Sequence, residues 1–130
     1  SRPLMFSAAL PPANTAGVLA ALDVIQSEPD RRESLWHNTR RLQEGFKGMG
    51  YDIGVSETPI VPVVIGPLWD TLKFWRRVFD SGIFTNPVMP PAVPPAECRL
   101  RTSLMASHTS DQIDFALETF AKLGKEVGII

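Results

Sequence analysis

The sequence predicts an α+β domain in which helices cover a small antiparallel sheet. Four stretches repeat apolar residues at helical spacing, and three shorter stretches are β-branched or alternate between apolar and polar residues. These elements run in the order arm, helix, helix, strand, helix, strand, strand, helix, which is typical of an α+β fold. A chain of 130 residues buries roughly two thirds of its unfolded surface, enough for one core.

The N-terminal part is predicted to be an arm followed by two helices. Residues 1–10 lack helix signals and are expected to be extended, whereas residues 13–27 repeat apolar residues at helical spacing. One face of this helix carries small residues suited to close packing: Ala13, Ala16 and Ala20. Pro29 interrupts the pattern, and Asp30 with Glu33 forms a capping box that predicts the start of the second helix.

The central part is predicted to place strands and a helix around one apolar core. Residues 60–65 form a β-branched strand in which Pro62 indicates an edge position or a bulge. A helix follows over residues 68–82, and a short strand at 83–88 leads into a proline-rich loop. The residues expected to face the core from the second and third helices are Leu35, Leu42, Phe46, Met49, Leu72, Trp75, Val78 and Phe79. Gly50 and Gly82 are expected to end these two helices.

The C-terminal part is predicted to be an alternating strand followed by a long helix. In the strand at 98–104, one face carries Arg99, Arg101 and Ser103, and the other carries Cys98, Leu100 and Thr102. Thr109 and Gln112 form a capping box at the start of the helix. Its apolar residues recur at helical spacing: Ile113, Ala116, Leu117, Phe120, Leu123 and Val127.

Charge and cysteine content argue against several classes of function. The chain carries 13 Lys or Arg and 14 Asp or Glu, so it has no basic surplus to neutralise nucleic-acid phosphates. Its single cysteine, Cys98, excludes an internal disulfide and a cysteine-cluster metal site, and fits a cytoplasmic protein. Neither histidine belongs to a metal-ligand pattern, and no apolar run is long enough for a transmembrane segment.

Arg101 is the candidate binding residue that the strand pattern indicates. Its guanidinium fork matches the two oxygens of a carboxylate, and its charge does not titrate away. The alternative is that Arg99 and Arg101 both lie on a solvated strand face. The preceding loop at 87–95 holds five of the twelve prolines and is expected to be either a rigid pocket wall or a surface polyproline segment. His108, just before a helix cap, is expected to bond to nearby backbone rather than to act in catalysis.

Five stretches, taken in order, resemble one enzyme family. They are SRPLMFSAALPP, TPIVPVVIG, GIFTNPVMPPAVP, RLRTSLMASHTSDQID and LGKEVGII. On these stretches the chain resembles the C-terminal part of the α-oxoamine synthases, which are pyridoxal-phosphate enzymes of the aspartate aminotransferase-like fold type I. The family includes serine palmitoyltransferase, 2-amino-3-ketobutyrate CoA ligase, 8-amino-7-oxononanoate synthase and 5-aminolevulinate synthase. The resemblance implies that the α+β fold is the C-terminal small domain of such an enzyme.

The resemblance also implies an activity and site residues. These enzymes are homodimers that join a small amino acid to an acyl-CoA with loss of carbon dioxide, giving an α-amino ketone. The second arginine of the strand, here Arg101, binds the α-carboxylate of the amino acid, and the proline loop forms a wall of the active-site entrance. The stretch around Phe6 and Ser7 reaches the cofactor phosphate of the partner subunit. Some serine palmitoyltransferases and oxononanoate synthases carry a further arginine where this chain has Met89, a departure from their pattern.

The lysines imply that the chain is a fragment. In the family, the cofactor lysine lies in a Thr-x-x-Lys motif upstream of the stretch that matches residues 1–12. No lysine here has that setting: Lys47, Lys73, Lys122 and Lys125. We therefore expect residues 1–29 to be an arm and linking helix from a missing large domain, and residues 30–130 to be the small α+β domain. The fragment alone is expected to hold no catalytic residue, to bind no pyridoxal phosphate covalently and to be inactive.

Two other interpretations stay open at this point. The order of elements after residue 59 also fits a free-standing ferredoxin-like regulatory module that binds an amino acid through Arg101. The first 50 residues distinguish the two, because an arm and two helices are surplus to such a module and expected in the synthase. A third interpretation, an interaction domain, is favoured if the helix at 13–27 is exposed in a dimer.

Overall fold

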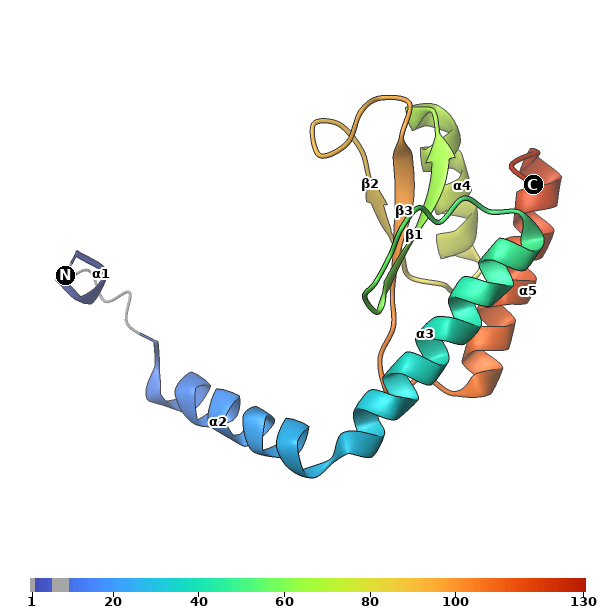
Figure 1. The fold of residues 1–130 in the computed structure, drawn as a ribbon. Coiled ribbons are helices and arrows are strands. Elements are labelled where there is room, and N and C mark those ends of the chain that lie inside the picture. Colours follow the sequence, from blue (N-terminus) through green and yellow to red (C-terminus); the bar gives the residue numbers. More distant parts are fainter. Residues whose placement is uncertain (1, 6–9) are drawn as a thin grey trace. The chain divides into compact units, whose positions relative to one another are not determined.

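The computed structural model describes residues 2–5 and 10–130 and divides the chain into two compact units, Ser1–Arg32 and Glu33–Ile130. The elements are α1 (Arg2–Met5), α2 (Pro12–Ser27), α3 (Pro29–Met49), β1 (Ile60–Gly66), α4 (Leu68–Asp80), β2 (Asn86–Val88), β3 (Cys98–Ser103) and α5 (Ser110–Val127), as labelled in Figure 1. The α+β class is confirmed. The assignment of residues 1–29 and 30–130 to different domains of a larger enzyme stays a prediction.

The sheet has three strands in the order β1-β3-β2, and both pairs run antiparallel. Pro62 therefore lies in an edge strand, as predicted, where the missing N–H of proline costs no interior ladder bond. The irregularity in β1 falls further along, between Val64 and Gly66. On the outer side of β1, the N–H of Val64 donates to the carbonyl of Asp52 (2.8 Å), so a loop covers part of this edge.

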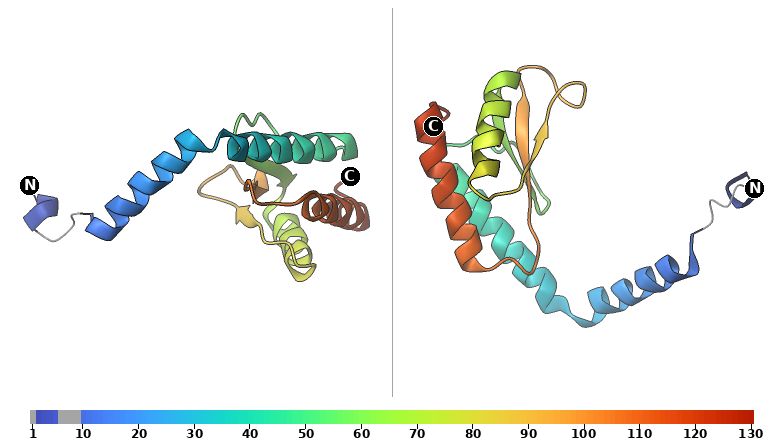
Figure 2. Two further views of the ribbon diagram at one scale, coloured as in Figure 1. Left: turned by 90° about the horizontal axis from the view of Figure 1, so that it is seen from below. Right: turned by 180° about the vertical axis from the view of Figure 1, so that it is seen from behind.

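One face of the sheet packs against helices to form the core. α4 lies across this face, α5 packs beside α4, and α3 lies beside α5 (Figure 2). The side chains of this core are Leu42, Phe46, Tyr51, Ile53, Val61, Val63, Phe74, Val78, Leu100, Ile113, Phe120 and Leu123. At its centre the ring of Phe120 lies 5.0 Å from that of Phe46 and 5.5 Å from that of Phe74. Such tilted and edge-on aromatic pairs add stability beyond the area they bury.

The inward stripe of α4 differs in part from the predicted one. Its buried residues are Thr71, Phe74 and Val78, so the stripe is turned by about one residue. Phe79, predicted to face the core, is 44% exposed, whereas Trp75 is half-buried and donates from Nε1 to the carbonyl of Thr85 (2.9 Å). Thr71 can be buried because its hydroxyl donates to the carbonyl of Pro67 (3.0 Å). The sequence pattern favoured the more apolar residues and missed this locally satisfied threonine.

The helix ends confirm one predicted capping box and correct the other. Thr109 caps α5 by accepting a hydrogen bond from the backbone N–H of Gln112 (3.3 Å), and Gln112 Oε1 accepts from the Thr109 N–H (3.0 Å). The box of Asp30 and Glu33 is wrong, because α3 begins at Pro29 and Asp30 already lies in its first turn. Proline suits the first helical position, where its missing N–H would have had no partner. Gly50 and Gly82 follow α3 and α4 with φ of +92° and +90°, as predicted for helix-ending glycines.

The unit Ser1–Arg32 is less buried than its sequence predicted. Residues Arg2–Met5 form a short helix rather than an extended arm, since a proline in the first turn is compatible with a helix. α2 buries none of its residues, so its small-residue face packs against nothing within the described part of the chain. Its exposed large apolar residues are Val18, Leu19, Leu22, Val24 and Ile25. A helix this apolar on all sides is typical of a buried element. Within residues 2–5 and 10–130, no helix is both long and apolar enough to cross a bilayer.

We expect the 130-residue chain to self-associate through α2 as its concentration rises, because burying the exposed half of each leucine side chain gains about 1 kcal/mol. Light scattering coupled to size exclusion measures the mass. The double variant Leu19→Glu, Leu22→Glu should lower the mass toward that of a monomer. Val55→Glu, which changes an exposed apolar residue of a loop outside α2, should not. A chain that stays monomeric at all concentrations would contradict this expectation.

We expect Gly124→Ala to destabilise the fold by about 2–3 kcal/mol. The added methyl group would collide with the phenol of Tyr51, which is buried and donates to the carbonyl of Phe120 (2.7 Å). Burial raises the pKa of this phenol, in line with its enclosure. Gly48→Ala is the matched control, because nothing lies within 4 Å of a Cβ there and alanine favours the helix by up to about 1 kcal/mol. Urea unfolding of both variants measures the difference, and equal effects would contradict the packing described.

Candidate functional site

The sheet face opposite the core carries a row of polar side chains along β3. Leu100 is fully buried, while Arg101 and Ser103 are exposed, which confirms the predicted alternation of this strand. In the strand register, Arg101 lies between Pro62 of β1 and Asn86 of β2. Residues directly opposite each other in an antiparallel pair project to the same face. These side chains therefore share the exposed face of the sheet.

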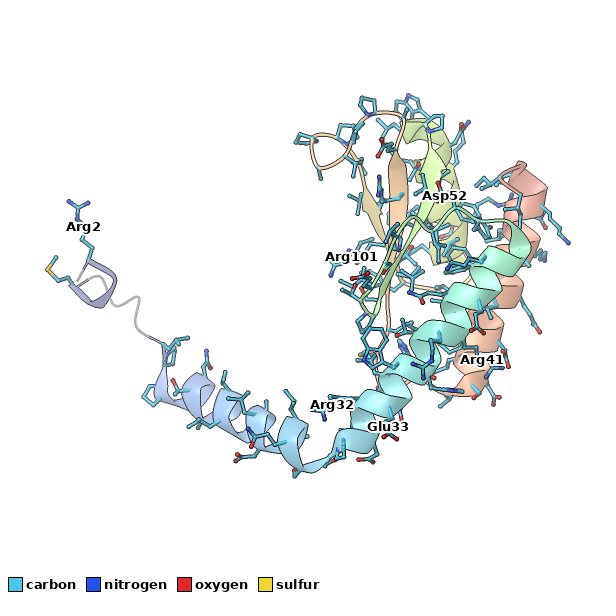
Figure 3. All side chains as sticks on the ribbon, viewed as in Figure 1. Arg2, Arg32, Glu33, Arg41, Asp52 and Arg101 are labelled. Carbon is cyan, nitrogen blue, oxygen red and sulfur yellow. The ribbon has the colours of Figure 1, made fainter. Side chains whose placement is uncertain are left out.

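The two arginines of β3 differ in their partners. Arg99 donates from Nη2 to a carboxylate oxygen of Glu97 (2.9 Å) and from Nε to the Glu97 carbonyl (3.0 Å). Within the part of the chain that the structure describes, Arg101 forms no ion pair and its side chain makes no hydrogen bond. Figure 3 shows Arg101 projecting from the sheet on the side away from α5. Arg101 is therefore the arginine of this strand whose fork is available to an anion.

The backbone that carries Arg101 is held on both sides by buried neighbours. Leu100 packs in the core, and the hydroxyl of Thr102 donates to the carbonyl of Val61 (2.7 Å). Because alternate residues of a strand point to opposite faces, fixing Leu100 and Thr102 in the core fixes the direction of Arg101. The guanidinium thus extends from a rigid base, as a residue that orients a ligand requires.

The proline loop between β2 and β3 is built from short turns. The N–H of Ala92 donates to the carbonyl of Met89 (3.0 Å), and the N–H of Glu97 donates to the carbonyl of Pro94 (2.9 Å). The bond between Pro90 and Pro91 is cis. Most of the loop is exposed, with Met89 and Val93 half-buried. Its predicted role as a wall of an active-site entrance stays a prediction.

Two surface hollows lie elsewhere on the unit Glu33–Ile130. One, of about 280 Å³, lies at the ends of α3 and α5 and includes Asp52 and Asp70. The other, of about 350 Å³, is lined by His37, Arg40, Arg41 and Glu44. Neither is lined by Arg101, so a cleft around that arginine stays a prediction. Among the described residues, no group of three or more His, Cys, Asp or Glu side chains is arranged to hold a metal ion.

The turn between β3 and α5 is tied to α3 by a residue that the sequence analysis missed. Asn38 is buried, and its amide donates to the carbonyls of His108 (2.9 Å) and Met105 (3.3 Å). His108 accepts a hydrogen bond at Nδ1 from the backbone N–H of Met105 (3.2 Å), as predicted for a histidine with a local structural role. No short sequence signal marks Asn38, because its partners lie about 70 residues away in the chain.

The remaining residues that bear on cofactor binding are Phe6, Ser7 and the four lysines. Phe6 and Ser7 lie outside the described residues. The lysines are all exposed, and they lie on helices that cover the core face of the sheet, opposite the face of Arg101: Lys47, Lys73, Lys122 and Lys125. That this chain binds no pyridoxal phosphate covalently stays a prediction.

The fold defines the class of this domain: a three-stranded antiparallel sheet, backed by helices, with an exposed arginine on its open face. Residues 1–120 match the family of class I and II aminotransferases, and the chain belongs to this family. Both the predicted resemblance and the predicted fold class are confirmed by the relatives and solved structures that the chain resembles.

The chain is similar to curated proteins with two names. It is 40% identical over 129 residues to the 8-amino-7-oxononanoate synthase of Thermoanaerobacter pseudethanolicus, covering 99% of this chain and 33% of that protein. It is 42% identical over 130 residues to the serine palmitoyltransferase of Bacteroides ovatus, covering 100% of this chain and 33% of that protein. The chain thus spans about a third of the length of these relatives. The two identities are nearly equal, so they do not assign the chain to one group over the other.

The fold is likewise similar to solved structures. A high-resolution structure of SPT with PLP as an internal aldimine superposes with a TM-score of 0.92 at 34% identity, covering 99% of this chain and 33% of that one. The serine palmitoyltransferase of Sphingomonas wittichii superposes with a TM-score of 0.88 at 31% identity, over 94% of this chain and 31% of that one. The small α+β fold is therefore one that larger enzymes of this family contain.

We expect Arg101→Gln to change the free energy of unfolding of the chain by less than about 0.5 kcal/mol, because its guanidinium makes no ion pair or hydrogen bond with any residue that the structure describes. Arg41→Gln is the contrasting variant, since Arg41 bridges both carboxylate oxygens of Asp114 (2.5 and 2.7 Å) and joins α3 to α5. It should cost about 0.5–1 kcal/mol. Urea unfolding measures both. A larger cost for Arg101→Gln than for Arg41→Gln would give Arg101 a structural role instead.

Proposed function

We propose that this chain is the C-terminal small-domain part of a pyridoxal-phosphate-dependent acyltransferase, which joins a small amino acid to an acyl-CoA with loss of carbon dioxide. Arg101 binds the α-carboxylate of the amino acid. The observation that carries the proposal is the contrast along β3: Arg99 is paired with Glu97, whereas Arg101 stands exposed on the same face with no partner among the described residues.

The chemistry of Arg101 suits this role. A guanidinium donates two parallel hydrogen bonds to a carboxylate, and each such charge-assisted bond is worth about 1.5–3 kcal/mol. Two parallel bonds also fix the plane of the carboxylate, and with it the orientation of the bonds at the α-carbon. When bound, pyridoxal phosphate supplies an electron sink for the bond that breaks at that carbon. Arg101 does not take part in bond breaking. By orienting the amino acid, it determines which bond at the α-carbon is aligned with the cofactor.

Family membership and the names of the relatives support the reaction class. The relatives are named for an amino ketone product in one case and for serine and a palmitoyl group in the other. A homodimer, in which Phe6 and Ser7 reach the cofactor phosphate of the partner subunit, belongs to the same proposal. The proposal also includes that the chain alone is inactive. Its lysines lie on helices that cover the side of the sheet opposite Arg101.

The regulatory module is the weaker alternative. A regulatory module does not account for the arm and the two helices of the first 50 residues. The family match extends over residues 1–120 and so includes them. The apolar surface of α2 also fits a helix that packs against further parts of an enzyme better than it fits a module that acts alone.

In the complete enzyme that carries this chain, we expect Arg101→Gln to raise the KM for the amino acid at least about 30-fold, because two charge-assisted hydrogen bonds are lost. The KM for the acyl-CoA should change less than about 3-fold, because that substrate does not contact Arg101. Steady-state kinetics with glycine, L-alanine and L-serine as the varied amino acids measure both constants.

Arg99→Gln is the matched control, since Arg99 lies on the same strand face two residues away and is already occupied by Glu97. It should leave the amino-acid KM within about 3-fold of the unmodified enzyme. An unchanged amino-acid KM in Arg101→Gln, or an equal rise in Arg99→Gln, would remove Arg101 from its assigned role.

A further inference from the structure

Asn86 is the polar side chain that the sheet register places directly beside Arg101. The two residues are partners in the antiparallel pairing of β2 with β3, and both are exposed. Directly opposite residues have Cβ atoms about 4.5–5.5 Å apart on a shared face. Their next neighbours across the same pair, Pro87 and Leu100, face the core side instead.

The surroundings of Arg101 are asymmetric. On the β1 side its register partner is Pro62, whose ring offers neither donor nor acceptor. On the β2 side stands the amide of Asn86, which makes no side-chain hydrogen bond within the described residues. Hence one flank of the Arg101 stem is an apolar wall and the other carries an unused hydrogen-bonding group.

We propose that Asn86 is a positioning residue for Arg101, an inference that rests on the function proposed above. The hydrogen bond between the two side chains is not formed within the described residues; when the substrate carboxylate binds, the amide oxygen of Asn86 accepts from the Nε–H of Arg101, which leaves both Nη groups directed at that carboxylate. An arginine has five N–H donors in a planar fork, so an end-on carboxylate leaves Nε–H to spare. A neighbour that accepts from Nε–H in the bound state fixes the plane of the guanidinium, and with it the plane of the carboxylate.

The neutrality of Asn86 is central to this role. Glu97 holds Arg99 through a carboxylate and thereby neutralises its charge. An amide holds a guanidinium without a charge of its own, so Arg101 keeps its full attraction for an anion. Glu97 is charged and Asn86 is neutral. This difference explains why Arg99 is paired within the fold while Arg101 stays able to bind a ligand.

The test uses the complete enzyme and the same varied amino acids, glycine, L-alanine and L-serine. Asn86→Leu, similar in size but without an acceptor, should raise the amino-acid KM about 3- to 10-fold, with kcat and the acyl-CoA KM within about 2-fold. Asn86→Asp should raise it further, about 30-fold, because an aspartate would pair with Arg101 and compete with the substrate. Val64→Thr, on the same face opposite Arg99 on the β1 side, is the control and should change none of these constants.

A double-mutant cycle separates positioning from other roles. In the Arg101→Gln background, Asn86→Leu should cause no further rise in the amino-acid KM, because its effect passes through Arg101. A full additional rise there, or equal effects of Asn86→Leu and Asn86→Asp, would overturn the inference. If Arg101→Gln raises the KM and Asn86→Leu does not, only the role of Asn86 fails. If Arg101→Gln itself has no effect, the proposed function fails first.

Discussion

The pairing of β3 with strands on both sides is the constraint on which the candidate site depends. β3 is the central strand, and Leu100 and Thr102 anchor one of its faces in the core. Since side chains alternate along a strand, burying these two residues forces Arg101 onto the opposite face. A slip of one residue in register would place a guanidinium in an aromatic core, which is prohibitively unfavourable. The same packing that stabilises the fold therefore aims the arginine.

Electrostatics then distinguishes two chemically identical side chains. Arg99 lies two residues from Glu97 and is paired with it, whereas no carboxylate of the described residues reaches Arg101. On a face open to water, an arginine alone binds a carboxylate weakly, because the solvent screens the attraction. Strong binding requires that the face be covered and the local dielectric lowered. In the proposed enzyme, the affinity of Arg101 for its substrate thus depends on polypeptide beyond these residues, although its direction does not.

Local features were predictable from the sequence, and features that depend on distant contacts were not. The alternation of β3 and the capping of α5 by Thr109 depend on neighbouring residues only, and the structure confirms both. The start of α3 at Pro29 was missed because two overlapping start signals compete there. Burial of Thr71 and the position of Asn86 beside Arg101 depend on how α4 and β2 meet the sheet, which no short pattern encodes. Likewise, Arg101 could be named from sequence, but its neighbours could not.

Within residues 2–5 and 10–130, two surfaces have no partner, one polar and one apolar. The unit Glu33–Ile130 has a closed aromatic core, so the exposure of Arg101 is not a sign of incomplete folding. α2, in contrast, buries none of its residues despite its apolar composition. The chain spans a third of the length of its relatives. Both surfaces are explained if one domain binds the carboxylate of the amino acid and another domain carries the attached cofactor. Substitutions of Arg101 would then change the affinity for the amino acid without changing covalent attachment of the cofactor.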